Sequence, residues 1–283
     1  MTPQLPLCCS PASFKLLSRY ASSERPDAIE SPQALVDGAI AVAMHQVEGI
    51  DPKAVDETLQ GYADLIQSRV RGPQEQALIA HLHEFLFEEM GFNGNTEDYY
   101  NPVNSYLPVV LETKRGLPIT LSLIYVDVAR RLDLDAWGVA LPGHFLAAVR
   151  SGNSIMLVDP FAGGKIVTID EAHERVKLLL GEEGEWSDEY LQPATNRHWL
   201  TRMIQNLLNV FTNTSRYTDV AAMLEMEMLL WPDQRQLERD LALVLARCGL
   251  SRPASKLLDQ YLQANPDDPQ RAQLQQLLTV LAA

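Results

Sequence analysis

A histidine and an aspartate in the middle of the chain have the residue types and the spacing of an acid–base pair. His144 follows a Pro-Gly turn signal, and Asp159 lies fifteen residues further along the chain. The turn-forming residues 151–153 lie between them, so we expect the two side chains to face one another across adjacent strands. In thiol-dependent acyl transfer, a histidine takes the proton of the nucleophile and a carboxylate orients the imidazole ring. The pair has the residue types for that chemistry.

The thiol nucleophile that such a pair requires is missing from this part of the chain. The three cysteines are Cys8, Cys9 and Cys248, all far from the pair in the sequence. A reactive thiol commonly lies at the N-terminus of a buried helix, where the helix dipole favours the thiolate. The helix expected in that place carries the hydroxyl groups of Thr120 and Ser122 instead. A hydroxyl has a much higher pKa than a thiol and depends heavily on an adjacent base.

The elements around the pair indicate an α+β fold. Residues 116–132 form the most apolar predicted helix, and a helix that is apolar on nearly all sides belongs in the middle of a domain. Short runs with turn residues between them follow, and they predict an antiparallel sheet of at least three strands. The strands are expected at 136–141, 145–150, 154–158 and 165–168. Before the central helix, we expect helices at 31–43, 51–66 and 74–90 and a loop at 93–102.

The C-terminal part of the sequence repeats with a period of about 34 residues, which is typical of tetratricopeptide repeats. Trp231-Pro232-Asp233 recurs as Asn265-Pro266-Asp267, and Leu224 recurs as Leu258 at the same interval. Ordinary helical hairpins would explain the apolar stripes but not this register. Two repeats rarely form a stable solenoid alone, so we expect this block to pack on the preceding domain. The predicted organisation is an N-terminal segment at 1–30, an α+β domain at 31–185 and a helical repeat domain at 195–283.

Composition argues against several classes of function. The formal net charge of −14 over 283 residues argues against nucleic-acid and anionic-membrane partners. No apolar run reaches the roughly 18 residues that span a bilayer, and we expect no secretory signal. The cysteine usage predicts a reducing, cytoplasmic location. No metal-ligand spacing, phosphate loop or dinucleotide fingerprint occurs, so we expect neither metal nor cofactor. The sequence indicates no particular oligomeric state.

Taken together, these motifs resemble a known family. The chain is similar to the SirB-type bacterial proteins, which join a transglutaminase-like domain to tetratricopeptide repeats. The likeness runs from about residue 30 to the end. Its motifs are Asn101-Pro102-Val103-Asn104-Ser105-Tyr106-Leu107, Lys114-Arg115-Gly116-Leu117-Pro118-Ile119-Thr120-Leu121-Ser122, Gly143-His144-Phe145-Leu146, Val158-Asp159-Pro160-Phe161 and Pro193-Ala194-Thr195-Asn196-Arg197.

The resemblance implies a transglutaminase-like or papain-like core with a degenerate cleft. The Gly-x-Cys element of active enzymes aligns with Gly116-Leu117-Pro118, which places Pro118 at the nucleophile position. Proline is also favoured in the first turn of any helix. His144 and Asp159 would then be a relic of the catalytic site. We assign to the cleft Asn101, Asn104, Glu112, Arg115 and Gly116.

Two hypotheses about function remain open. The first is a non-catalytic, cytoplasmic interaction or regulatory protein whose C-terminal repeats bind a protein or peptide partner. Its degenerate cleft would serve as a second recognition site. The alternative is an amide-bond hydrolase or acyltransferase that uses His144 and Asp159 with Thr120 or Ser122 as nucleophile. Ser122 would point a full turn away from the nucleophile position.

Overall fold

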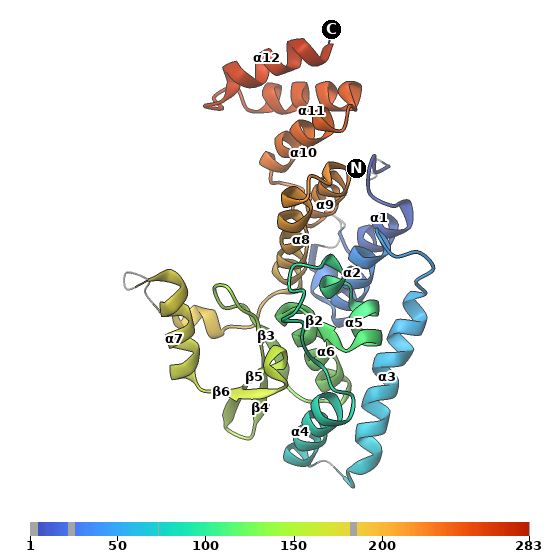
Figure 1. Cartoon of the computed structure of the whole chain (residues 1–283), viewed down its shortest axis with the longest axis vertical. Coiled ribbons are helices and arrows are strands. Elements are labelled where there is room, and N and C mark those ends of the chain that lie inside the picture. Colours follow the sequence, from blue (N-terminus) through green and yellow to red (C-terminus); the bar gives the residue numbers. More distant parts are fainter. Residues whose placement is uncertain (1–4, 22–25, 73, 182–185, 283) are drawn as a thin grey trace.

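Helix α6, Pro118–Arg131, lies at the centre of the structure, a computed structural model that describes residues 5–21, 26–72, 74–181 and 186–282 (Figure 1). Proline begins the helix, at a position where no intrahelical N–H partner is needed. Every residue from 118 to 129 except Asp127 is buried, as the apolar sequence predicts. Tyr125 tolerates full burial because its hydroxyl shares a hydrogen bond of 2.9 Å with His83 Nε2.

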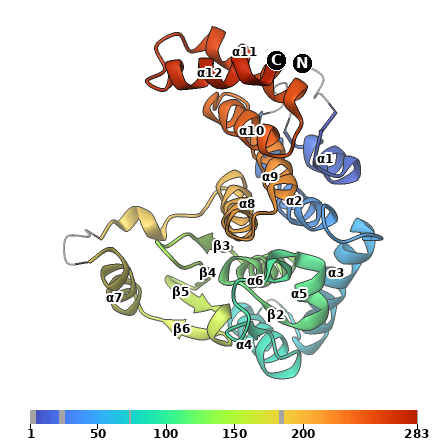
Figure 2. The same cartoon turned by 45° about the horizontal axis from the view of Figure 1, so that its top comes forward.

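The predicted antiparallel sheet is present and has four strands. They are β3 Ala136–Val139, β4 Leu146–Ser151, β5 Ser154–Asp159 and β6 Lys165–Val167, hydrogen-bonded in that order. Alternate residues of β4 face opposite sides, as the pleat requires. Ala147 and Val149 join the core around α6, whereas Leu146 and Ala148 pack with residues of α7, Ile169–Leu180. Figure 2 shows the sheet between these two helices.

Four of the helices that precede the sheet pack around α6: α2 Pro32–Met44, α3 Pro52–Arg69, α4 Glu75–His83 and α5 Leu107–Thr113. Helix α4 continues as a π-helical turn over Glu84–Glu89, and α1 Pro11–Ser18 packs on α2. The expected loop at 93–102 differs at its start. Asn93–Gly94 (β1) pairs in parallel with Arg115–Gly116 (β2), because backbone groups meet there without any side-chain pattern to announce them.

The C-terminal helices follow one another away from the sheet (Figure 1). They are α8 Asn196–Asn213, α9 Tyr217–Leu230, α10 Gln236–Arg247, α11 Ser251–Ala264 and α12 Arg271–Ala282. The first and last residues of α11 are offset from those of α9 by one and the same interval, which is the period of the sequence repeat. The residues that end the two helices, Trp231 and Asn265, have nearly the same backbone angles, with φ of −128° and −126°. The local conformation therefore repeats with the period seen in the sequence.

A tryptophan joins the helical block to the sheet. Trp199 of α8 lies on Phe145, with ring centroids 4.5 Å apart, and its indole N–H donates to the Ile119 carbonyl at 3.3 Å. One apolar core consequently extends from Cys9 to Ala254 and crosses the domain boundary expected between residues 185 and 195. No helix in the described part of the chain is both long and apolar enough to cross a membrane.

The contact between Trp199 and the sheet predicts a steric effect of substitution at Gly138 of β3. A methyl group there would overlap the Trp199 ring and press on Phe145. Gly138→Ala is expected to lower the free energy of unfolding by about 1–3 kcal/mol, the usual cost of overpacking. Gly61→Ala in α3 is the matched control, since its methyl group meets no atom within 4 Å. That control should raise stability by about 0.5–1 kcal/mol. Denaturant titration followed by circular dichroism measures both, and equal values would contradict the close approach.

Candidate functional site

His144 and Asp159 lie in contact at one end of the sheet. His144 closely precedes the start of β4, and Asp159 ends β5. Nε2 of His144 is 3.1 Å from Oδ2 of Asp159, and the two side chains are 20% and 3% exposed. The contact lacks the geometry of a hydrogen bond, so the buried Nε2 atom has no hydrogen-bond partner among the described residues. The imidazole is therefore next to the carboxylate but is not oriented as in a working triad.

The carboxylate of Asp159 is also hydrogen-bonded to an arginine that sequence reasoning missed. Arg175 of α7 donates from Nη1 to Oδ2 of Asp159 at 2.6 Å. Oδ1 accepts a weaker bond of 3.3 Å from the backbone N–H of Ala162. Burial alone would raise the pKa of the Asp159 carboxyl, but the neighbouring His144 and Arg175 outweigh it and hold that pKa below its usual value. The carboxylate is thus ionised and already paired.

The loop that carries His144 is contacted by side chains from several elements. The Phe161 ring stands edge-on to His144 with centroids 6.2 Å apart, and Tyr99 stands edge-on to Phe161 at 5.9 Å. Phe161 rests on Gly94, where a side chain would overlap its ring. Arg202 of α8 donates to the His144 carbonyl at 2.9 Å. These contacts fix the loop that carries the histidine and occupy space beside its ring.

The first turns of α6 supply no activated nucleophile. Pro118 is buried there and has neither a polar side chain nor an N–H. The hydroxyl of Ser122 donates to the Phe145 carbonyl at 3.4 Å. The hydroxyl of Thr120 is fully buried and has no hydrogen-bond partner in the described part of the chain. Neither hydroxyl is hydrogen-bonded to His144, which is the contact that a general base would need.

The two N-terminal cysteines are also unsuited to nucleophilic chemistry. Burial, together with the nearby Glu225 charge, raises the pKa of both the Cys8 and the Cys9 thiol to about 12. A thiol with such a pKa is neutral near pH 7, and the thiolate is the reactive form. Both residues lie against α9, where the Glu225 carboxylate accepts their backbone N–H groups.

The residues assigned to the cleft organise the neighbouring loop. Asn104 is buried, and its side-chain amide donates to the carbonyls of Asp98 and Tyr99 at 2.7 and 3.1 Å. Asn101 caps the 3₁₀ turn Pro102–Ser105 by accepting the Val103 N–H. Both asparagines therefore hold the backbone of the segment that leads into α5.

The other three assigned residues lie around the short β1–β2 ladder. Arg115 donates to the Gly91 carbonyl at 2.6 Å, and Gly116 pairs with Gly94. A side chain at Gly116 would press on Val110 of α5. Glu112 is exposed on α5. None of the five assigned residues forms a hydrogen bond or ion pair with His144 or Asp159 in the described structure.

A cavity of about 360 Å³ lies between this loop and α8. We call it the tyrosine–asparagine cavity, after the residues that line it most prominently: Tyr99, Tyr100 and Asn101 on the loop, and Asn206, Asn209 and Asn213 on α8. Leu117, which precedes α6, also lines it, so the cavity lies next to the helix N-terminus. The three α8 side chains make no hydrogen bond with the described residues. Their spacing of three and four residues, which places them on one face of the helix, is the signal in the sequence that could have identified them.

The described residues contain no group of three or more histidine, cysteine, aspartate or glutamate side chains that could hold a metal ion. The site is therefore built from one ion-paired carboxylate, one partly exposed imidazole and a neutral cavity lined in part by amide side chains. Such groups bind and orient polar ligands, and they lack a nucleophile for acyl transfer.

Comparisons with known proteins place these features in a wider group. The model of the transglutaminase-like superfamily matches residues 53–205, which include His144 and Asp159. A UPF0162 protein of Xylella fastidiosa (strain 9a5c) is 35% identical over 238 residues, covering 82% of this chain and 84% of that protein. A UPF0162 protein of Pseudomonas aeruginosa is 28% identical over 183 residues, covering 63% and 65%.

A more distant similarity is found in a longer eukaryotic protein. F-box only protein 21 of Homo sapiens is 26% identical over 234 residues, which make up 78% of this chain and 36% of that protein. No solved structure matches the chain. The transglutaminase-like and bacterial parts of the predicted resemblance are confirmed by these matches. The SirB name and the tetratricopeptide repeats stay predictions.

The low pKa of Asp159 predicts how stability depends on pH. A carboxyl whose pKa is lower in the folded than in the unfolded chain stabilises the fold above its unfolded pKa of about 3.9 and loses this effect as pH falls through the folded value. Asp159→Asn is expected to lower the free energy of unfolding by about 1–3 kcal/mol at neutral pH, because the contacts to Arg175 weaken. The difference from the unmodified chain should shrink below about pH 4.

Asp135→Asn is the matched control for this prediction. Asp135 pairs with Arg150 on the surface, where the two side chains are 61% and 48% exposed. Its loss should change the free energy of unfolding by less than about 1 kcal/mol. Urea denaturation at a series of pH values gives both curves. If Asp159→Asn were no more destabilising than Asp135→Asn, the buried pair would have no role in stability.

Proposed function

The chain belongs to the transglutaminase-like superfamily, and we propose that it is a member without catalytic activity that recognises a peptide or an amide group in its cleft. The observation that carries the proposal is the set of contacts made by the His144–Asp159 pair. Its carboxylate is hydrogen-bonded to Arg175, Phe161 stands beside its ring, and no hydroxyl is hydrogen-bonded to the imidazole. Such contacts keep the cleft folded without a nucleophilic thiol.

One observation favours the catalytic alternative. Thr120 carries a buried hydroxyl without a hydrogen-bond partner, close to the start of α6 where the superfamily resemblance would place a nucleophile. An unpaired buried hydroxyl costs stability, and function is one reason to retain it. The lack of a hydrogen bond between Thr120 and His144 weighs against an amide-bond hydrolase or acyltransferase, and so does the high pKa of an unassisted hydroxyl.

The tyrosine–asparagine cavity is where we propose that the peptide binds. Its volume of about 360 Å³ falls in the usual range for ligand sites. Asn206, Asn209 and Asn213 can each donate to a carbonyl and accept from an N–H, which suits a peptide backbone or a carboxamide. Residues 209 and 213 are about 6 Å apart along the helix, close to the roughly 6.8 Å repeat of an extended chain. Tyr99 and Tyr100 add aromatic surface.

We further propose that α8–α12 are tetratricopeptide-like repeats that bind a protein partner. The support is the equal offset between the starts and the ends of α9 and α11, together with the matching backbone angles at Trp231 and Asn265. The proposal includes a cytoplasmic location, which the three unpaired cysteines favour. Removal of residues 195–283 would strip Trp199 from the shared core, so point variants are better tests than truncation.

The absence of catalysis is tested with a fluorophosphonate probe that phosphonylates activated hydroxyl groups. We expect no labelling that depends on His144. Thr120→Val is the sharp comparison, since valine keeps the shape and removes the unpaired hydroxyl. Its free energy of unfolding should be unchanged or up to about 1 kcal/mol higher. Probe labelling that disappears in both His144→Ala and Thr120→Val would establish the catalytic alternative.

The recognition role is tested with peptides selected from a random displayed library on the full chain. The double variant Tyr100→Ala, Asn209→Ala should weaken their binding about tenfold, which corresponds to about 1.4 kcal/mol. Gln67→Ala, which removes an exposed amide from α3, is the control and should bind normally. Anisotropy titrations with labelled peptides measure the dissociation constants. Selected peptides that bind both variants equally would rule out the cavity as their site.

A further inference from the structure

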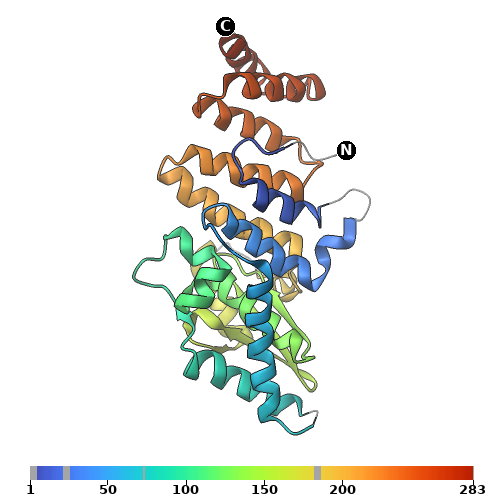
Figure 3. The ribbon, with the colours of Figure 1, turned by 90° about the vertical axis from the view of Figure 1, so that its right-hand side faces the viewer.

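A second and larger cavity lies on the other side of the helical block. Its volume is about 810 Å³, and it lies between the N-terminal segment Leu5–Leu7 and helices α9, α10 and α11. We call it the N-terminal groove. Figure 3 shows the N-terminal segment running beside these helices. It shares no lining residue with the tyrosine–asparagine cavity.

The wall of the groove formed by the N-terminal segment is hydrogen-bonded to a buried carboxylate. Glu225 of α9 is 6% exposed, and its two oxygens accept the backbone N–H groups of Leu7, Cys8 and Cys9 at 2.6, 3.1 and 2.7 Å. Hydrogen bonds to a carboxylate are about twice as strong as neutral ones. The three N–H groups therefore satisfy the Glu225 carboxylate and hold residues 7–9 against α9.

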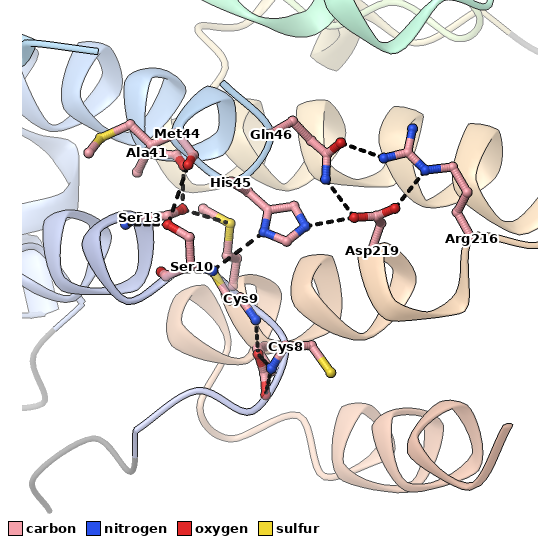
Figure 4. Close-up of polar contacts among 12 residues, drawn as sticks. Cys8, Cys9, Ser10, Ser13, Ala41, Met44, His45, Gln46, Arg216 and Asp219 are labelled. Atoms are coloured by element: carbon pink, nitrogen blue, oxygen red, sulfur yellow. Dashed lines mark hydrogen bonds and ion pairs between the residues drawn. The ribbon is translucent and has the colours of Figure 1, made fainter. Parts of the chain in front are cut away.

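A histidine anchors the same segment a few residues further on (Figure 4). Nδ1 of His45 accepts the backbone N–H of Ser10 at 3.4 Å, and its Nε2 lies 2.9 Å from Oδ1 of Asp219. The hydroxyl of Ser13 donates to the Ala41 carbonyl of α2. The N-terminal segment is thus tied to α2 and α9 together, and the groove is formed before any partner arrives.

The floor of the groove is apolar and one edge is cationic. The floor comprises Met228, Leu229, Leu241, Leu245 and Leu257. Arg252 and Lys256, one helical turn apart on α11, are exposed lining residues and form no ion pair with any described residue. The chain as a whole has a net charge of −14, so these two cations make the edge of the N-terminal groove locally positive in a negatively charged protein. Charges at the edge of an interface select partners of opposite sign.

We propose that the N-terminal groove binds an amphipathic, acidic helical segment of a partner protein. Its large apolar side chains, at intervals of three and four residues, would fill the floor, as in other helix-in-groove complexes. Carboxylates on its flank would pair with Arg252 and Lys256. Residues 5–7 do not fill the groove themselves, because Leu5 and Leu7 on its wall remain 85% and 53% exposed. Because this wall is already held by hydrogen bonds, little conformational entropy is lost there when the partner binds.

The test uses two fluorescein-labelled peptides and the full chain. The first peptide has leucines at intervals of three and four residues and glutamates elsewhere, and its twin has lysines in place of the glutamates. The acidic peptide should bind, and the double variant Arg252→Glu, Lys256→Glu should weaken that binding at least about tenfold. Lys177→Glu on exposed α7 makes half of that charge change away from the groove and should have little effect. Fluorescence anisotropy measures each dissociation constant.

Reversal of preference distinguishes the groove from general charge attraction. The lysine twin should bind the unmodified chain poorly and should gain affinity for the double variant. Both substitutions lie on exposed residues, so the fold should be retained, and circular dichroism checks this. The proposal is overturned if neither peptide binds, if both bind equally, or if Lys177→Glu weakens binding as much as the double variant does.

Discussion

The close approach of Trp199 to Gly138 is the constraint on which the rest of the structure depends. Because Gly138 has no side chain, α8 comes near enough to β3 for the indole to lie on Phe145 and to donate to the Ile119 carbonyl. That contact fixes the helical block against the sheet and α6 together. It also determines where the following turns of α8 lie, with Arg202 on the His144 carbonyl and three asparagines facing the loop at 99–105. The cleft is therefore assembled from both halves of the chain.

The electrostatics of the cleft explain why its polar pair persists without a nucleophile. A carboxylate that is only 3% exposed needs a counter-charge, since an unpaired buried charge would cost several kcal/mol. Arg175 supplies that charge at 2.6 Å. Removing Asp159 would leave Arg175 without its partner. Stability alone is thus sufficient to retain the pair, whichever ligand the cleft accepts.

Much of the α+β part could be predicted from the sequence, because its signals are local. Alternating apolar residues and Gly-containing turns marked β3–β6 to within about two residues, and a helix that is apolar on nearly all sides marked α6. The β1–β2 ladder was missed because two backbone segments meet there with no side-chain period. Arg175 was missed because nothing in an amphipathic helix identifies which of its cations faces a buried carboxylate. The hydrogen bond between the Cys9 N–H and the Glu225 carboxylate joins residues 216 positions apart, and no local pattern encodes such a contact.

The hydrogen bonds from residues 7–9 to Glu225 connect the shape of the N-terminal groove to the stability of the fold. A glutamate that is 6% exposed is tolerated only because three backbone N–H groups of the N-terminal segment satisfy it. Moving that segment away would break its hydrogen bonds to the Glu225 carboxylate, so the segment is a fixed wall and a poor mobile lid. A wall that is already ordered contributes no further conformational entropy cost when a ligand enters. Affinity in the groove then depends on how well the incoming side chains match its apolar floor and the two cations at its edge.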